Sequence, residues 1–227
     1  MILPTITTIS PDWRERIKEI SKFGLKEVNL FLTCLNKEER QEIYELLKRI
    51  KITRIPFVHL RSDMEPQELD FLTKEYKTEV YNIHTNREYP LKFNHGERKK
   101  NIYIENTFLP YDEEEVKQFG GICLDFAHLE NARVFRPEMY RQNIEIIEKY
   151  ECGCNHISPG VEFSLFEKEQ WLGKKHPHVL KNLSQLDYLK RYPQKYFSGH
   201  IAMEIENSIE EQLEAIKYIK SILPHVR

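Results

Sequence analysis

The stretch GICLDFAHLE, residues 121–130, begins like a buried strand and then places Asp125 and His128 three positions apart. A short apolar run of this kind is typical of a strand in a parallel sheet. An aspartate at its end has two common explanations. It can cap a following helix, or it can belong to an active site, because α/β folds place catalytic groups where their parallel strands end. The rest of the chain has to decide between them.

Seven other segments have the same strand-like character, being short and rich in β-branched or aromatic residues. With residues 121–128 they give eight predicted strands, the others being 2–8, 27–33, 54–60, 79–85, 101–107, 152–158 and 200–207. Amphipathic segments between most of them predict helices at 11–24, 36–50, 65–76, 112–120, 136–150, 183–192 and 208–223. Strands and helices therefore alternate along the chain.

Helix-start signals support two of these helices, and one connection lacks a helix altogether. Pro11 stands where the first turn of the first helix is expected, and Asn36 with Glu39 has the spacing of a capping box. Residues 86–100 carry Pro90 and Gly96 and show no sustained helical period. We expect the helix after the fourth strand to be missing or replaced by a loop.

This alternation predicts the α/β class and a single (β/α)₈ TIM barrel over residues 1–227, in a short version of that fold. An open doubly wound sheet is the rival. The barrel is favoured because polar residues fall toward the carboxyl end of six different predicted strands, the end at which barrel active sites lie. These residues are His59, His84, Glu105, Asp125, His156 and Glu204.

Composition narrows the function classes. Charged residues make up 31% of the 227 residues, the net charge is -2, and no apolar run is long enough for a membrane span. Lysine and arginine are spread along the chain, so the sequence does not indicate a basic face that would bind nucleic acid. A nucleic-acid partner stays open as an alternative. The first residues lack signal-peptide features, and four irregularly spaced cysteines do not form a disulfide framework, so a cytoplasmic location is expected.

The converging polar residues predict a metal site. Each has a simpler explanation when taken alone, since a strand-end aspartate often caps a helix and a lone histidine often serves the core. Six separate explanations of this kind would have to hold at six strand ends. A single divalent cation explains all six residues together, because it neutralises buried carboxylates and fixes the imidazoles around it. Glu204 and Glu206 share a face, and Glu204 is favoured as the ligand. Cys152 and Cys154 are interpreted as core filling on the face of His156.

Four motifs resemble the xylose isomerase-like TIM-barrel superfamily, which includes sugar isomerases and epimerases and the endonuclease IV family of zinc-dependent nucleases. The motifs are YIENT at 103–107, LDFAHL at 124–129, CNHIS at 154–158 and AMEIEN at 202–207. The epimerase branch implies one divalent metal, zinc or manganese, held by Glu105, Asp125, His156 and Glu204. In that branch the two glutamates also exchange protons with the substrate, and His128 contacts it.

The endonuclease IV branch implies three zinc ions with further ligands. These would fall on His59, His84 and His128, and on an Asp-x-His pair after the seventh strand. This chain has KKHPHVL at 174–180, so His176 stands where the resemblance expects the aspartate and His178 where it expects the histidine. The two histidines around Pro177 have an alternative explanation as loop residues without a role in the site.

Three hypotheses follow for the function of this chain. Its expected partner is a small-molecule substrate. The leading one is a metal-dependent isomerase or epimerase that acts on a sugar or polyol by proton transfer between Glu105 and Glu204. The second is an endonuclease IV-like hydrolase of phosphodiesters that uses several zinc ions. The third is a metal-binding barrel without turnover. The number of bound metal ions distinguishes the first two.

Overall fold

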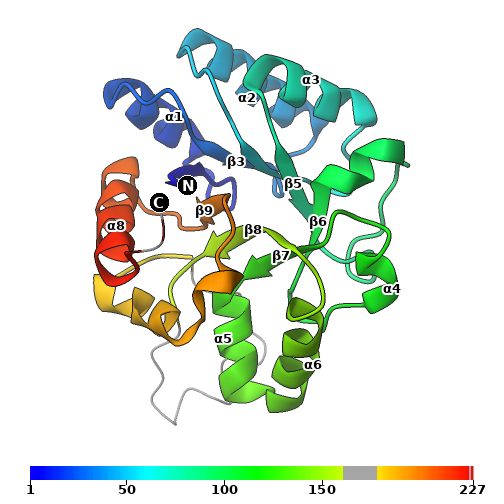
Figure 1. The fold of residues 1–227 in the computed structure, drawn as a ribbon. Coiled ribbons are helices and arrows are strands. Elements are labelled where there is room, and N and C mark those ends of the chain that lie inside the picture. The colour runs from blue at the N-terminus through cyan, green and yellow to red at the C-terminus, as the bar shows by residue number, and fades with distance from the viewer. Residues whose placement is uncertain (161–177, 225, 227) are drawn as a thin grey trace.

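Parallel strands form a nearly closed barrel in the computed structural model, which describes residues 1–160, 178–224 and 226 (Figure 1). In the described residues the strands are β1 (Ile2–Leu3), β2 (Thr5–Ile6), β3 (Asn29–Phe31), β4 (Phe57–His59), β5 (Val80–Ile83), β6 (Ile102–Glu105), β7 (Ile122–Asp125), β8 (Cys152–Ile157) and β9 (Ile201–Met203). Their order is β1-β9-β8-β7-β6-β5-β4-β3-β2.

The first segment joins the two edges of this sheet. β1 pairs with β9, and β2, one residue further on, pairs with β3. Pro4 stands between them, and since proline has no N–H to give to a ladder, it divides one predicted strand into two. All eight predicted strands are present, and the predicted TIM barrel is confirmed rather than the open sheet.

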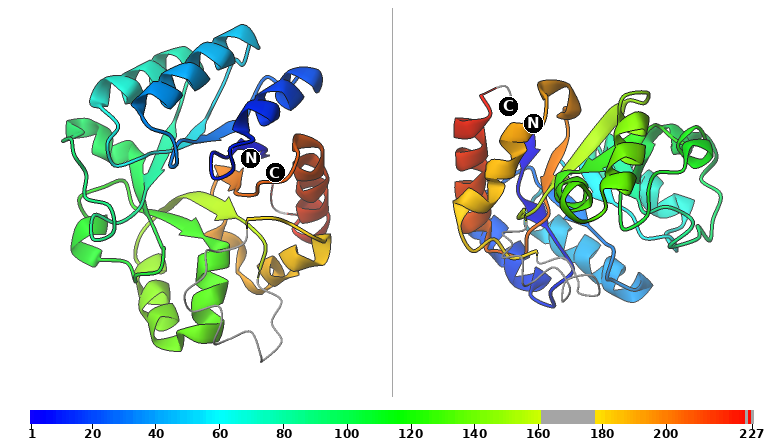
Figure 2. Two further views of the ribbon diagram at one scale, coloured as in Figure 1. Left: turned by 180° about the vertical axis from the view of Figure 1, so that it is seen from behind. Right: turned by 90° about the horizontal axis from the view of Figure 1, so that it is seen from below.

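Helices surround the strands on the outside (Figure 1), and Figure 2 shows the same ring from two further directions. The α-helices are α1 (Trp13–Lys22), α2 (Lys37–Arg49), α3 (Pro66–Tyr76), α4 (Glu113–Val116), α5 (Phe126–Phe135), α6 (Pro137–Ile147) and α8 (Ile209–Ile222). Short 3₁₀ helices add η1 (Gly96–Asn101), η2 (Leu183–Arg191) and η3 (Gln194–Tyr196). None of the described helices has the length and apolar character needed to cross a membrane.

Local signals account for most of the helix starts. The side chain of Asn36 accepts from the backbone N–H of Glu39, and the Glu39 side chain accepts in return, both at 2.9 Å, so the predicted capping box is confirmed. Pro11 instead precedes the cap residue Asp12, so α1 begins two residues after the proline. The segment at 183–192 forms a 3₁₀ helix, and the one at 112–120 contains a single α-helical turn.

The connection after β5 has no α-helix, as predicted. The described chain runs through turns from residue 84 and then forms η1. Glu115, on α4, holds the start of this connection, because its carboxylate accepts from the Thr85 hydroxyl at 2.5 Å and from the Asn86 backbone N–H at 2.7 Å. A buried carboxylate thus anchors a connection that has no helix of its own.

The strand predicted over 121–128 is wrong in its last three residues. β7 ends at Asp125, and α5 begins at Phe126 because the Asp125 side chain accepts from the backbone N–H of His128 at 2.7 Å and caps the helix. This helix was not predicted. It lies between β8 and α6 and buries most of its residues, so its sequence lacks the polar stripe of a surface helix.

A bulge in β8 corrects the prediction that Cys152 and Cys154 share a face. Ile122 pairs with Cys152 and Cys123 with Cys154, so Gly153 is skipped in the ladder. Cys154 packs inside the barrel in a cluster of buried side chains formed by Phe31, Phe57, Val80, Cys123, Cys154 and Ala202. Cys152 packs instead against the larger core that contains the helices.

Gly153 is required at this bulge because the Tyr103 ring lies against it, and a Cβ there would meet the ring at 2.1 Å. We expect Gly153→Ala to lower the free energy of unfolding by about 1–3 kcal/mol, measured by urea denaturation. Gly199→Ala is the matched control, since a Cβ there meets nothing within 4 Å. The penalty should shrink in a Tyr103→Ala background, and an equal penalty there would contradict this explanation.

Candidate metal centre

Four acidic and imidazole side chains meet at the carboxyl end of the barrel. Glu105, Asp125 and His156 lie at the ends of β6, β7 and β8, and Glu204 directly follows β9. Each is buried, and each offers a ligand atom that lies within 4.8 Å of the other three. These are the four residues that the sequence analysis grouped together, and their duty as metal ligands stays a prediction.

The Nδ1 atom of His156 faces all three carboxylates. It lies 3.4 Å from Glu204 Oε2, 3.5 Å from Glu105 Oε1 and 3.9 Å from Asp125 Oδ2. Within the described structure, His156 Nδ1, Asp125 Oδ2 and Glu204 Oε2 are buried without any hydrogen-bond partner. Unpaired buried polar atoms are costly, and three of them aimed at one point are satisfied together by a cation. The residues present therefore fit a divalent metal.

The electrostatics of the cluster support the same conclusion. Burial, together with the neighbouring carboxylates of Glu204 and Glu105, raises the pKa of Asp125 well above its usual range. Burial would raise the pKa of Glu105 too, but His156, His84 and His59 hold it well below its usual value. Crowded carboxylates repel one another, so a bound divalent cation would stabilise their charged forms.

Asp125 serves the fold and the cluster with different oxygens. Its Oδ1 caps α5, whereas its Oδ2 faces His156. Asn106 holds the backbone of Asp125 from both sides, since its Oδ1 accepts from the Asp125 N–H at 2.7 Å and its Nδ2 donates to the Asp125 carbonyl at 2.9 Å. The two explanations for a strand-end aspartate are therefore compatible here.

A second group of ligand atoms gathers on the other oxygen of Glu105. His59 Nε2 lies 3.0 Å from Glu105 Oε2 and 3.2 Å from His84 Nε2, and His84 Nε2 lies 3.7 Å from the same oxygen. Tetrahedral zinc with bonds of about 2.0–2.1 Å to nitrogen and oxygen holds its ligand atoms about 3.3 Å apart. The three separations of 3.0, 3.2 and 3.7 Å lie close to that value.

The hydrogen bond of His59 determines which of its ring nitrogens carries the proton. His59 Nδ1 lies 2.9 Å from the carbonyl oxygen of Leu60, and because a carbonyl only accepts, Nδ1 is the donor. In a neutral His59 the lone pair on Nε2 then points at the carboxylate of Glu105, which repels it. A hydrogen bond to the far nitrogen is how metal-binding histidines are usually oriented.

Glu105 is thus positioned to bridge two groups, since Oε1 faces His156 and Oε2 faces His59 and His84. Burial lowers the pKa of His84 to about 4, which keeps its imidazole neutral near pH 7. Asn82 donates to Glu105 Oε2 at 2.6 Å and fixes the carboxylate. Asn82 was not predicted from the sequence, although it lies on β5 two residues before His84, which directly follows the strand, and this spacing favours one face for both.

Two further predicted histidines, His128 and His178, lie at the edge of the site. His128 lies in the first turn of α5, and its ring meets the edge of Phe108 at 4.9 Å between centroids. His178 has its Nδ1 3.2 Å from the carbonyl oxygen of Glu204. His176 lies outside the described residues. Glu204 belongs to the cluster, whereas Glu206 lines the cavity beside it.

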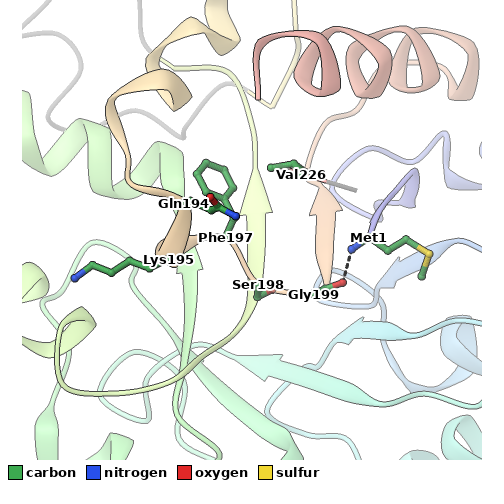
Figure 3. Close-up of a pocket in the computed structure, with 7 residues that line it drawn as sticks. All are labelled: Met1, Gln194, Lys195, Phe197, Ser198, Gly199 and Val226. Atoms are coloured by element: carbon green, nitrogen blue, oxygen red, sulfur yellow. Dashed lines mark hydrogen bonds between the residues drawn. The ribbon is translucent and has the colours of Figure 1, made fainter. Parts of the chain in front are cut away.

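A cavity of about 610 Å³ opens onto this cluster. Its described lining residues are Ile9, Thr33, Cys34, His59, Leu60, Arg61, Ser62, Ile83, His84, Tyr89, Glu105, Phe108, His128, His178, Val179, Glu204 and Glu206. A second cavity of about 700 Å³ lies at the amino ends of β1 and β9, where the Met1 ammonium donates to the Gly199 carbonyl (Figure 3). Its described lining contains neither a carboxylate nor a histidine, whereas the lining of the first cavity contains both.

Comparison with known proteins gives a likeness in fold. The structure matches a xylose isomerase-like TIM barrel protein from Mycobacterium smegmatis, solved in complex with magnesium, with a TM-score of 0.49 and 12% identity over 98% of this chain and 97% of that one. The chain is similar in fold to that barrel. The fold is also similar to that of an aldo-keto reductase from Bacillus halodurans, with a TM-score of 0.45 and 9% identity over 100% of this chain and 92% of that one. It is similar as well to that of an HpcH/HpaI aldolase from Desulfitobacterium hafniense, with a TM-score of 0.41 and 11% identity over 97% of this chain and 92% of that one. No family model and no curated protein matches the chain.

The two duties of Asp125 can be separated by substitution. Asp125→Asn keeps an oxygen that can cap α5 but removes the charge, so we expect loss of bound metal with little loss of stability. Asp125→Ala should lose metal and also destabilise the fold by about 0.5–2 kcal/mol more, because the cap is gone. Elemental analysis and urea denaturation measure the two effects. Full metal content in Asp125→Asn would refute the proposed ligand.

Proposed function

We propose that this protein is a metal-dependent hydrolase of a phosphate ester in a small molecule. The observation that supports it is the double engagement of Glu105, which offers one oxygen to His156 and the other to His59 and His84. Two-metal sites in phosphoester hydrolases hold their ions about 3.5–4 Å apart, a spacing that a bridging carboxylate can span. Zinc or manganese suits imidazole and carboxylate ligands.

Each side chain has a separate task in this proposal. Divalent ions bound here would activate water and neutralise the charge that develops on a phosphate ester. The chain itself supplies orientation: the Leu60 carbonyl fixes the ring of His59, and Asn82 fixes the carboxylate of Glu105. Phe31 packs on the ring of His156 with 4.7 Å between centroids and holds it toward the carboxylates. His128 lines the cavity, and in this proposal it contacts the substrate.

The size of the cavity favours a small substrate over a DNA duplex. About 610 Å³ falls within the range of small-molecule sites, which is roughly 300–1,000 Å³. A duplex would require many phosphate contacts from basic side chains, and the chain has a net charge of -2. A nucleic-acid substrate of the endonuclease IV kind therefore has less support than a small phosphate ester.

A metal-dependent isomerase or epimerase is the second candidate, because Glu105 and Glu204 both line the cavity and could exchange protons with a sugar or polyol. This mechanism needs a free oxygen on each glutamate. Glu105 Oε2 already accepts from Asn82 at 2.6 Å and lies 3.0 Å from His59 Nε2, which limits it as a base. A barrel that binds metal without turnover is the third candidate.

Changing His59 and His84 together to glutamine separates these candidates. If both imidazoles are metal ligands, the double variant should lose at least one equivalent of metal per chain and most of its hydrolysis of bis(p-nitrophenyl) phosphate, about 100-fold or more. His200→Gln is the control, because His200 pairs with Glu79 away from the cavity. Elemental analysis of protein purified without chelators, together with the phosphodiesterase rate, gives the answer.

Unchanged metal content in the folded double variant would overturn the hydrolase in favour of the single-metal isomerase. In that case epimerisation of a ketose should survive the substitution, with only the substrate affinity altered. Wild-type protein that holds its metal but turns over neither a phosphodiester nor a ketose would favour the binding module.

A further inference from the structure

One wall of the catalytic cavity carries a single strong cation. Among the described lining residues Arg61 is the only lysine or arginine, and it lies two residues beyond the end of β4. Glu105, Glu204 and Glu206 line the same cavity. Arg61 forms no ion pair with any of these three in the described structure, so its charge is not used up by the metal ligands.

A row of alternating charges holds this guanidinium at the cavity. Arg61 Nε lies 3.0 Å from Asp63 Oδ1, and the same oxygen accepts from Nη1 of the buried Arg40 at 3.2 Å. Arg40 in turn donates to both oxygens of Glu68 at 2.9 Å. Because Arg40 and Glu68 neutralise each other in the core, Asp63 is fixed in position and can orient Arg61.

The outer edge of this guanidinium has spare donors. Arg61 Nη1 makes one long contact, 3.5 Å from the Thr33 carbonyl, and Nη2 has no protein partner among the described residues. Thr33 and Ser62, which both carry a hydroxyl, are among the residues that line the same cavity. Thr33 Oγ1 lies 3.9 Å from the Cys34 thiol, a long contact. A guanidinium edge in a cavity that is also lined by two hydroxyl-bearing residues matches the acceptors of an oxyanion.

We propose that Arg61, Thr33 and Ser62 form a subsite for an oxyanion group, phosphate or carboxylate, on a part of the substrate other than the bond that reacts. The substrate class would then be a small phosphate ester with a second acid group. The identity of the reacting bond rests on the proposed function, whereas the subsite does not. An acid group in this cavity would otherwise meet the carboxylates of three glutamates and be repelled.

The test measures anion binding by calorimetry on the full chain with its metal, using inorganic phosphate and malonate as probes. Arg61→Gln should weaken binding of the recognised anion about tenfold or more, because a charge-assisted hydrogen bond is lost. Arg61→Lys should recover part of the affinity, since it keeps the charge but not the fork. The anion that binds in an Arg61-dependent way identifies the acid group as phosphate or carboxylate.

Arg87→Gln is the matched control. Arg87 is about as exposed as Arg61 and does not line the cavity, and its Nε forms a longer ion pair, 4.0 Å from Asp112 Oδ2, than the 3.0 Å pair of Arg61 with Asp63. Its substitution should leave anion affinity within about twofold of wild type. Equal weakening in Arg87→Gln would show a general charge effect, and it would overturn the subsite. So would unchanged affinity in Arg61→Gln, or a wild-type protein that binds neither anion.

Elemental analysis of the same samples keeps the two proposals separate. Arg61-dependent anion binding in a protein without metal would support the subsite and refute the metal-dependent hydrolase. If the protein holds its full content of metal and the Arg61→Gln variant binds the anion as tightly as wild type, the subsite is refuted and the hydrolase is not. Metal content equal to wild type in Arg61→Gln is expected, because Arg61 is no member of the cluster.

Discussion

The burial of three carboxylates around one imidazole is the constraint on which this structure depends. Glu105, Asp125 and Glu204 all face His156 at the carboxyl end of the barrel, and the cluster leaves three buried polar atoms without a partner in the described chain. Without a cation, repulsion among the carboxylates and the cost of desolvation would oppose folding. A bound divalent ion turns the same arrangement into a stabilising one, so metal binding and folding should be coupled.

The barrel makes this arrangement possible by separating packing from chemistry along each strand. Below the cluster, Cys123 and Cys154 fill the interior with apolar neighbours, and two residues further along the same strands Asp125 and His156 reach the rim. Asp125 shows how closely the two layers are joined, because one of its oxygens starts α5 and the other faces the cluster. A change at this position therefore affects the fold and the site by different routes.

Sequence patterns predicted the barrel and the rim residues because strand periodicity and strand ends are local properties. They missed α5 because that helix is buried on most sides and has no polar stripe, so its first residues resembled a continuing strand. The bulge at Gly153 could not be predicted either. A residue skipped in the ladder moves the following side chains to the other face of the strand, but it leaves the composition of the segment unchanged. Periodicity could place His59 and His84 on the rim, but which oxygen of Glu105 they face depends on side-chain rotamers, which the sequence does not give.

Anomalous diffraction at the zinc and manganese absorption edges, from crystals of protein purified without chelators, tests the central claim most directly. We expect one peak within bonding distance of His156 Nδ1 and Glu105 Oε1, and a second within bonding distance of the Nε2 atoms of His59 and His84 and of Glu105 Oε2. Bonding distances would be about 2.0–2.2 Å for zinc. Ordered side chains at both places with no anomalous peak between them, even after metal is added, would contradict it.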